Sequence, residues 1–194
     1  MKEQGNIHFC GVGGQGILLA SELTAHALLA GGFDAKKSEV HGMAQRGGSV
    51  EAHLRFGRGK VYSPLIEPGT VDIMLAFEMM EAVRYLPFLN KKSTVIVNTQ
   101  KIAPPVVATG KMPYPEQCLD AITKHGITVV PVDAFAIARQ VGNLKAVNVA
   151  LVGVLSRYLP MSESIWLEVI KKRLPAKILD VNLKAFHEGR KASQ

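Results

Sequence analysis

A glycine-rich stretch near the start of the chain, GVGGQG at residues 11–16, directly follows the apolar run IHFC at residues 7–10. Gly11, Gly13 and Gly16 satisfy the Gly-x-Gly-x-x-Gly spacing of a loop between a strand and a helix. Glycines let a backbone come close to an anion, and a helix N-terminus offers free N–H groups. The stretch therefore predicts a strand–loop–helix unit that could cradle a phosphate or another anion. The alternative is a tight turn that binds nothing.

The rest of the chain alternates strand-like and helix-like stretches, as is typical of an α/β protein. Apolar runs at 71–77 and 94–98 predict interior strands, and the alternation over 50–56 predicts a half-buried one. We expect a single domain over 1–194, with a Rossmann-like three-layer fold, a mostly parallel sheet and a helical C-terminal part from about residue 134. Strands are expected at 6–10, 33–38, 50–56, 71–77, 94–98 and 127–132. Helices are expected at 16–30, 78–89, 116–125, 134–141, 148–159 and 162–173, with a further turn or two over 182–188 and a loop over 99–115 that carries a short edge strand at Val106-Val107.

Bulk composition fits one soluble globular domain, with 194 residues, 47% apolar and 20% charged. No apolar run could span a bilayer, and the N-terminal residues do not form a signal peptide. Cys10 and Cys118 belong to no Cys-x-x-Cys motif, so we expect no metal site and no iron–sulfur cluster held by this chain alone. These features favour a cytoplasmic protein without a membrane partner.

The net charge of +7 is spread along the chain, without a basic stripe interleaved with aromatic residues. Bulk charge of this kind could serve an acidic protein or an anionic cofactor. Nucleic acid is not an expected partner, because a basic patch is the informative sign.

A second glycine-rich segment, HGMAQRGGS, occupies residues 41–49. The guanidinium of Arg46, flanked by glycines, can grip a phosphate or carboxylate with two hydrogen bonds. The alternative is a solvated arginine on a flexible turn. The two segments together predict a binding or interface site at Gly11, Gly13, Gly14, Gln15, Gly16, Arg46 and Gly47, with His41 and Gln45 as polar helpers.

Other polar residues are weaker candidates. Glu39 lies near the offset at which dinucleotide enzymes carry an acidic residue, but it opens a glycine-rich bend and follows two lysines. His26 is expected in the core, satisfied by a partner, and Cys10 is expected to be a core residue rather than a nucleophile. His53 is expected on the polar face of its strand.

Three further residues fall at the predicted ends of elements. Asn98 and Asp133 follow strands, at the edge where doubly wound sheets bind ligands. Asp133 could equally cap the next helix, which we favour. Asn148 is either a cap or a polar contact at a partner surface.

Several catalytic patterns are missing from the sequence. It contains no Gly-Asp-Gly segment followed by an asparagine pair, the pattern of a thiamine diphosphate and magnesium site, and no Ser/His/Asp order that suggests a hydrolase. We therefore expect no catalytic residue in this chain.

The two glycine segments resemble the gamma-type domain of the 2-oxoacid:ferredoxin oxidoreductase family. In the wider family the second motif usually reads Tyr-Gly-x-Glu-x-Arg-Gly-Gly, and the HGMAQRGG at residues 41–48 is similar to the indolepyruvate (arylpyruvate) branch. The resemblance covers nearly the whole chain. It continues at Ser63-Pro64-Leu65-Ile66, Ala76-Phe77-Glu78, Val95-Ile96-Val97-Asn98, Tyr114-Pro115, Gly142-Asn143, Asn148, Asn182 and Ala185-Phe186.

This resemblance implies a Rossmann-like sheet and an accessory role. In the indolepyruvate branch this domain is the beta subunit, inactive alone. A larger alpha subunit carries thiamine diphosphate, magnesium and iron–sulfur clusters. The complex oxidatively decarboxylates an arylpyruvate, transfers the acyl group to coenzyme A and reduces ferredoxin. The small subunit would help to hold coenzyme A or line the substrate route.

The sequence alone leaves three alternative functions open. One is the gamma subunit of a pyruvate or branched-chain 2-oxoacid enzyme of the same family. Another is a free-standing NAD(P)- or flavin-dependent oxidoreductase. The third is a non-catalytic scaffold with a structural glycine loop. The isolated chain could also form a homo-oligomer.

Overall fold

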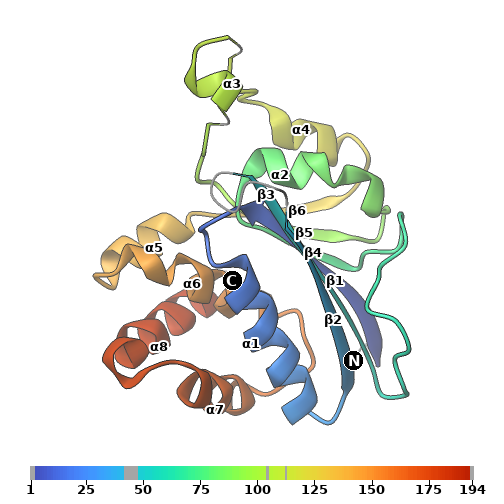
Figure 1. The fold of residues 1–194 in the computed structure, drawn as a ribbon, viewed down its shortest axis with the longest axis vertical. Helices are drawn as coiled ribbons and strands as arrows, with labels where there is room; N and C mark the ends of the chain where they lie inside the picture. The colour runs from blue at the N-terminus through green and yellow to red at the C-terminus, as the bar shows by residue number, and fades with distance from the viewer. Residues whose placement is uncertain (1–2, 42–47, 104, 112, 193–194) are drawn as a thin grey trace.

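In a computed structural model, the chain forms one six-stranded sheet with helices on both faces (Figure 1). The structure describes residues 3–41, 48–103, 105–111 and 113–192. The strand order is β2-β3-β1-β4-β5-β6. The strands are β1 (Gln4–Val12), β2 (Asp34–His41), β3 (Ser49–Gly57), β4 (Ile73–Ala76), β5 (Thr94–Asn98) and β6 (Thr128–Val132).

One strand runs against the others. Strands β1, β4, β5 and β6 pair in parallel, whereas β3 pairs antiparallel with both β1 and β2. Strand β2 therefore points the same way as β1. The predicted α/β fold with a mostly parallel sheet is confirmed.

Five helices and a short 3₁₀ turn form the lower layer of Figure 1. They are α1 (Ile17–Ala30), α5 (Ala134–Gln140), η2 (Leu144–Ala146), α6 (Val147–Leu155), α7 (Glu163–Arg173) and α8 (Ala176–Lys191). All nine residues of α6 are buried, because it lies between α1, α5 and α8. The larger of two apolar cores fills this side of the sheet.

Helices α6 and α8 touch backbone to backbone. A Cβ atom at Gly189 would lie 2.0 Å from the carbonyl oxygen of Ala150. One at Gly153 would lie 2.2 Å from the carbonyl oxygen of Phe186. Only glycine permits this approach, which brings the last helix against the centre of the layer.

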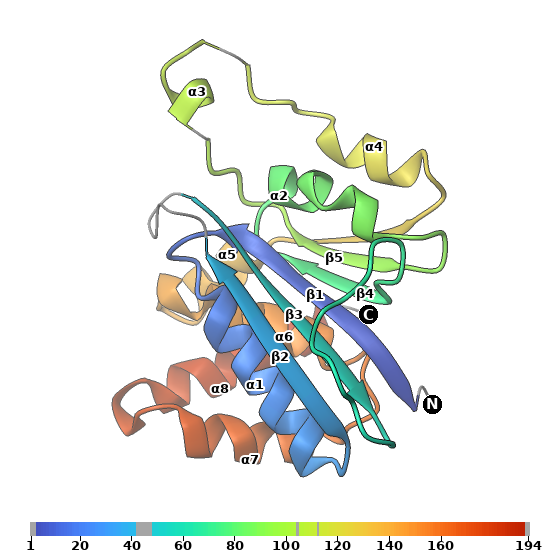
Figure 2. The same ribbon diagram turned by 45° about the vertical axis from the view of Figure 1, so that its right-hand side comes forward.

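The opposite layer is smaller and contains α2 (Met79–Arg84), η1 (Leu86–Phe88), α3 (Pro105–Ala108) and α4 (Cys118–Thr123) (Figure 2). Helix α2 lies over β1, β4 and β5. Its N-cap is Glu78, whose carboxylate accepts the backbone N–H groups of Met80 at 2.6 Å and Glu81 at 3.1 Å. Within the described residues, no helix is both long enough and apolar enough to cross a bilayer.

Some predicted elements were wrong. The Val106-Val107 pair lies in helix α3 rather than in an edge strand, since Pro105 occupies the first helical position, where its missing N–H costs nothing. The predicted helix over 78–89 divides into α2 and η1, with Pro87 inside the second piece. The tail predicted over 182–188 is part of the much longer helix α8, whose buried residues Asn182, Ala185, Phe186 and Gly189 follow one helical stripe.

His26 also departs from its prediction. Its side chain is 41% exposed and lies 3.9 Å from the carboxylate of Glu22, one turn earlier on α1. The helix is apolar nearly all round, but His26 lies on its partly exposed side together with Glu22. Cys10, in contrast, is fully buried as predicted, and burial raises the pKa of its thiol well above the usual range.

Candidate functional site

The two glycine segments meet at the carboxyl edge of the parallel strands. Val12 ends β1 and pairs with Ser49, which begins β3. Because β3 is reversed, its amino end lies at the same edge as the carboxyl end of β1. The backbone N–H of Gly13 donates to the carbonyl oxygen of Gly48 at 2.8 Å. The structure thus joins the first loop to the end of the second segment.

Two glycines of the first loop have positive φ angles. Gly14 has φ +102°, and a Cβ atom at this position would have no neighbouring heavy atom within 4 Å. Gly16 has φ +80° and precedes α1, and a Cβ there would lie 2.4 Å from Nδ2 of Asn148. The loop is therefore closed on its Gly16 side by α6 and open at Gly14.

The side chain of Gln15 holds the loop in place through two hydrogen bonds within the protein. Its Oε1 accepts the backbone N–H of Val12 at 2.7 Å, and its Nε2 donates to the carbonyl oxygen of Phe77 at 2.9 Å. Phe77 lies between β4 and α2, so the side chain ties the loop to the neighbouring crossover. Both ends of the amide are engaged inside the protein, which assigns Gln15 a structural part in the predicted site.

A pocket of about 480 Å³ lies beside the open side of the loop. Its polar lining comes from the glycine loop together with Gln100, Lys145 and Asn148, and its apolar lining from Ile102, Phe135, Leu144 and Val147. Lys145 supplies a cation that sequence reasoning missed. Its position just after Gly142-Asn143 was the available signal, but no spacing rule connects that turn to the first loop.

The arginine-bearing part of the second segment lies outside the described residues. This applies to Gln45, Arg46 and Gly47. His41 is the last residue of β2 and pairs with Val50 across the hairpin, and its side chain is outside the described part of the chain.

The polar residues at the other strand ends have structural partners. Asp133 caps α5 by accepting the N–H of Ala136 at 2.8 Å, as predicted. Asn98 is fully buried and links two crossovers, donating to Phe77 and accepting from the N–H of Ala134. Asn148 contacts the Gly16 side of the loop within the same chain rather than a cap position.

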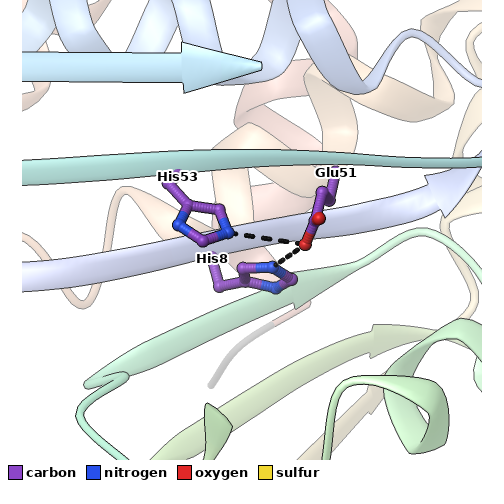
Figure 3. Close-up of side chains that lie close together, drawn as sticks. All are labelled: His8, Glu51 and His53. Carbon is purple, nitrogen blue, oxygen red and sulfur yellow. Dashed lines mark hydrogen bonds and ion pairs between the residues drawn. The ribbon is translucent and has the colours of Figure 1, made fainter. Parts of the chain in front are cut away.

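A second polar cluster consists of His8, Glu51 and His53 (Figure 3). Nε2 of His8, on β1, is 2.8 Å from Oε2 of Glu51, on β3, and Nε2 of His53 is 3.4 Å from the same oxygen. His8 is fully buried, and its ring stacks on Phe88 with centroids 5.2 Å apart. His53 faces the polar side of its strand, as predicted, but it is buried there.

The pKa values of Glu51 and His8 are both lowered, which favours a charged carboxylate beside a neutral His8 imidazole. Burial alone would raise the pKa of Glu51, but hydrogen bonds from His53 and His8 and the charges those rings can carry outweigh it and lower the pKa to about 2. Burial chiefly lowers the pKa of His8, with its hydrogen bond to Glu51 opposing. The cluster is thus a half-buried carboxylate hydrogen-bonded to two buried imidazoles.

Two imidazoles and a carboxylate within 4.8 Å of one another are also the ligand set of many metal sites. The hydrogen bonds here do not fit that use. The backbone N–H of Ile66 donates to Nδ1 of His53 at 3.0 Å, so Nδ1 bears no proton and Nε2 of the neutral ring does. A metal-binding imidazole instead donates through its second nitrogen. We therefore interpret the cluster as hydrogen-bonded structure.

A third polar group lies nearer the glycine loop. The hydroxyl of Ser49 donates to Oε2 of Glu81 and lies 3.0 Å from the hydroxyl of Tyr85. Glu81 Oε1 accepts from Nε of Arg84 at 3.0 Å. Glu81 is buried, whereas Arg84 is mostly exposed.

A mostly parallel sheet with helices on both faces and a glycine loop at its carboxyl edge defines a Rossmann-like domain. The chain belongs to the pyruvate ferredoxin/flavodoxin oxidoreductase family, whose characteristic pattern it matches over residues 6–192. It is 45% identical over 188 residues to the indolepyruvate oxidoreductase subunit IorB of Archaeoglobus fulgidus, a match that covers 95% of this chain and 92% of the relative. The common gamma subunit of pyruvate/ketoisovalerate oxidoreductases from Pyrococcus furiosus is more distant, at 27% over 187 residues and 94% of each chain.

The fold agrees with a solved structure of 2-oxoglutarate:ferredoxin oxidoreductase from Magnetococcus marinus. The TM-score is 0.78 at 20% identity, over 100% of this chain and 31% of that one. The same fold therefore also occurs as part of a longer polypeptide.

Proposed function

We propose that this chain is the accessory, beta subunit of an indolepyruvate (arylpyruvate):ferredoxin oxidoreductase. The complex would oxidatively decarboxylate an arylpyruvate, form the aryl-acetyl-CoA and reduce ferredoxin. The observation that carries the proposal is the pair of glycine segments joined at one sheet edge, in a chain 45% identical to an IorB subunit over nearly the full length of both.

The redox cofactors do not fit this chain. Its two cysteines are buried, and burial raises the pKa of both thiols, whereas cluster ligands are thiolates. The sequence contains no thiamine diphosphate motif. In the proposed complex the alpha subunit holds the thiamine diphosphate, magnesium and iron–sulfur clusters, and ferredoxin meets the complex there.

We propose that this chain contributes a binding surface to the complex, at the sheet edge that carries the glycine loop. Gly14 presents an open backbone, and Lys145 adds a positive charge in the adjoining pocket. With Arg46 on the second segment, this edge suits an anionic group such as a phosphate of coenzyme A, or an acidic patch of the alpha subunit.

The test is reconstitution. The chain and its alpha subunit are purified separately, and dye reduction that depends on arylpyruvate and coenzyme A is measured for each alone and for the mixture. We expect activity only in the mixture. Full activity of the alpha subunit alone, unchanged by adding this chain, would contradict the proposal. A substrate profile of the same complex separates arylpyruvates from pyruvate and branched-chain 2-oxoacids.

The strand order disfavours a free-standing NAD(P) or flavin enzyme. In a dinucleotide fold the second strand lies beside the first and brings its acidic residue to the ribose. Here β3 separates β2 from β1, and Glu39 on β2 is paired with Lys37. Calorimetry of the isolated chain with NAD(P) and flavin nucleotides should show no binding.

A further inference from the structure

Glu81 is a buried carboxylate on a helix whose cap is already formed. Its side chain is only 6% exposed, and Glu78 accepts the free N–H groups at the start of α2. Burying a carboxylate is costly unless it is hydrogen-bonded. The position of Glu81 therefore depends on the donors that its two oxygens accept from.

The first donor to Glu81 is the hydroxyl of Ser49, which is next to the glycine loop. The Ser49 hydroxyl donates to Oε2 of Glu81 and also lies 3.0 Å from the hydroxyl of Tyr85, the residue that follows α2. Ser49 directly follows Gly48, whose carbonyl oxygen accepts the N–H of Gly13. Three contacts thus connect a helix in the upper layer to the loop at the sheet edge.

The residue before the N-cap of the same helix contacts the loop at a second point. Nε2 of Gln15 donates to the carbonyl oxygen of Phe77, the residue before the N-cap Glu78. A loop with four glycines in six residues has little conformational restraint of its own. Its geometry must come from its neighbours, and the stretch from Phe77 to Glu81 supplies one contact directly to Gln15 and another through Ser49 and Gly48.

We propose that Glu81 is a positioning residue that acts through Ser49 and Gly48 to hold the loop of residues 13–16 in its binding geometry. The kinetic part of this inference rests on the proposed function. The structural part concerns the chain alone and can be tested without any activity.

The structural test is amide hydrogen exchange of the isolated full-length chain. Glu81→Leu and Ser49→Ala should each speed exchange at Gly13 and its loop neighbours about tenfold, the change expected on losing one hydrogen bond to a charged group. Glu81→Gln keeps an acceptor for Ser49 and should restore most of the protection. Arg84→Ala is the matched control, because Arg84 contacts Glu81 but not Ser49. Unchanged exchange at Gly13 in both Glu81→Leu and Ser49→Ala would overturn the inference.

The kinetic test uses the complex with the alpha subunit. Ser49→Ala should raise the KM for coenzyme A about fivefold or more while kcat stays within about twofold, since one lost hydrogen bond misplaces a binding loop without touching the reacting atoms. Ser156→Ala removes a buried hydroxyl contact on α6, in the opposite layer, and serves as a stability-matched control with unchanged KM. An equal rise of KM in Ser49→Ala and Ser156→Ala would show a general loss of stability, and would contradict the positioning role of Glu81. If the wild-type complex shows no arylpyruvate activity, the proposed function fails, whereas the exchange result still decides the positioning role.

Discussion

Gly13 and Gly48 are joined by one backbone hydrogen bond of 2.8 Å, between the start of the first glycine loop and the residue before β3. The bond uses main-chain atoms only, so it places the two segments side by side whatever side chains they carry. Its partners are fixed by the pairing of Val12 with Ser49 in the sheet. The second segment therefore ends at a defined point next to the first loop.

Replacing Arg46 tests whether the second segment binds an anion. If its guanidinium grips a phosphate of coenzyme A, Arg46→Ala should weaken the apparent affinity of the complex for coenzyme A about tenfold or more, since a charge-assisted contact contributes about 1.5–3 kcal/mol. Arg46→Lys keeps the charge but loses the planar fork, so it should recover only part of the affinity. Titration of the complex measures both. Unchanged kinetics in Arg46→Ala would favour the scaffold alternative.

Gly16 should tolerate alanine less well than Gly14. Both have positive φ, but only at Gly16 would the new Cβ meet a side chain, that of Asn148. We expect Gly16→Ala to lower the free energy of unfolding by about 2 kcal/mol or more, and Gly14→Ala by about 1 kcal/mol. Denaturant unfolding measures both. Combining Gly16→Ala with Asn148→Ala should cost less than the sum of the single changes, because the clash is removed; strict additivity would contradict this steric explanation.

The close approach of α6 and α8 predicts strong sensitivity at Gly189. A methyl group there would lie 2.0 Å from the backbone of Ala150, so Gly189→Ala should force the helices apart and destabilise the fold by about 1–3 kcal/mol. Gly59→Ala is the matched control, since a Cβ at that position meets nothing within 4 Å and its φ is not positive. Thermal unfolding of the two variants, followed by circular dichroism, should differ accordingly. Equal melting temperatures would argue against the tight helix crossing.

The cluster of His8, Glu51 and His53 predicts loss of stability in acid. The pKa of His8 is lowered in the fold, so below about pH 6.5 the unfolded chain binds a proton that the folded chain resists. The pKa of Glu51 is lowered to about 2, so its contribution is complete above its ordinary value of 4.5 and is lost as the pH falls from there towards 2. Both effects have the same sign.

Melting temperatures between pH 4 and pH 8 measure this dependence. The wild-type value should fall on acidification from about pH 6.5, the ordinary pKa of histidine. His8→Phe keeps the stacking on Phe88 but removes the titrating group, so the slope between pH 5 and 6.5 should flatten. A slope identical to that of the wild type would show that other groups cause the loss.

Much of the fold follows from local sequence patterns. The strand–loop–helix start and the apolar runs of β4 and β5 are continuous in the chain, so periodicity alone places them. Helix α8 was underestimated because charged residues are interspersed with apolar ones along its length, and its buried stripe becomes visible only once α6 is there to cover it. The position of β3 between β1 and β2 is a choice of pairing that no local pattern contains.

The candidate site was likewise predictable only where it depends on residues that are close in sequence. The spacing of the glycines located the loop, but the lock formed by Gln15 depends on a crossover that is distant in sequence. Glu51 and His53 alternate on one strand face, whereas their contact with His8 depends on the register between β1 and β3. Lys145 reaches the pocket through the packing of α5 and α6.

Because β3 is reversed, the two glycine segments should differ in how well they tolerate insertions and deletions. The loop of residues 11–16 joins a buried strand to a buried helix, so an insertion there would displace α1 from the core. The second segment closes an antiparallel hairpin at the rim of the sheet, where doubling a loop costs only about 0.6 kcal/mol in closure entropy. A change in the length of the second segment should therefore disturb the fold less than the same change in the first loop.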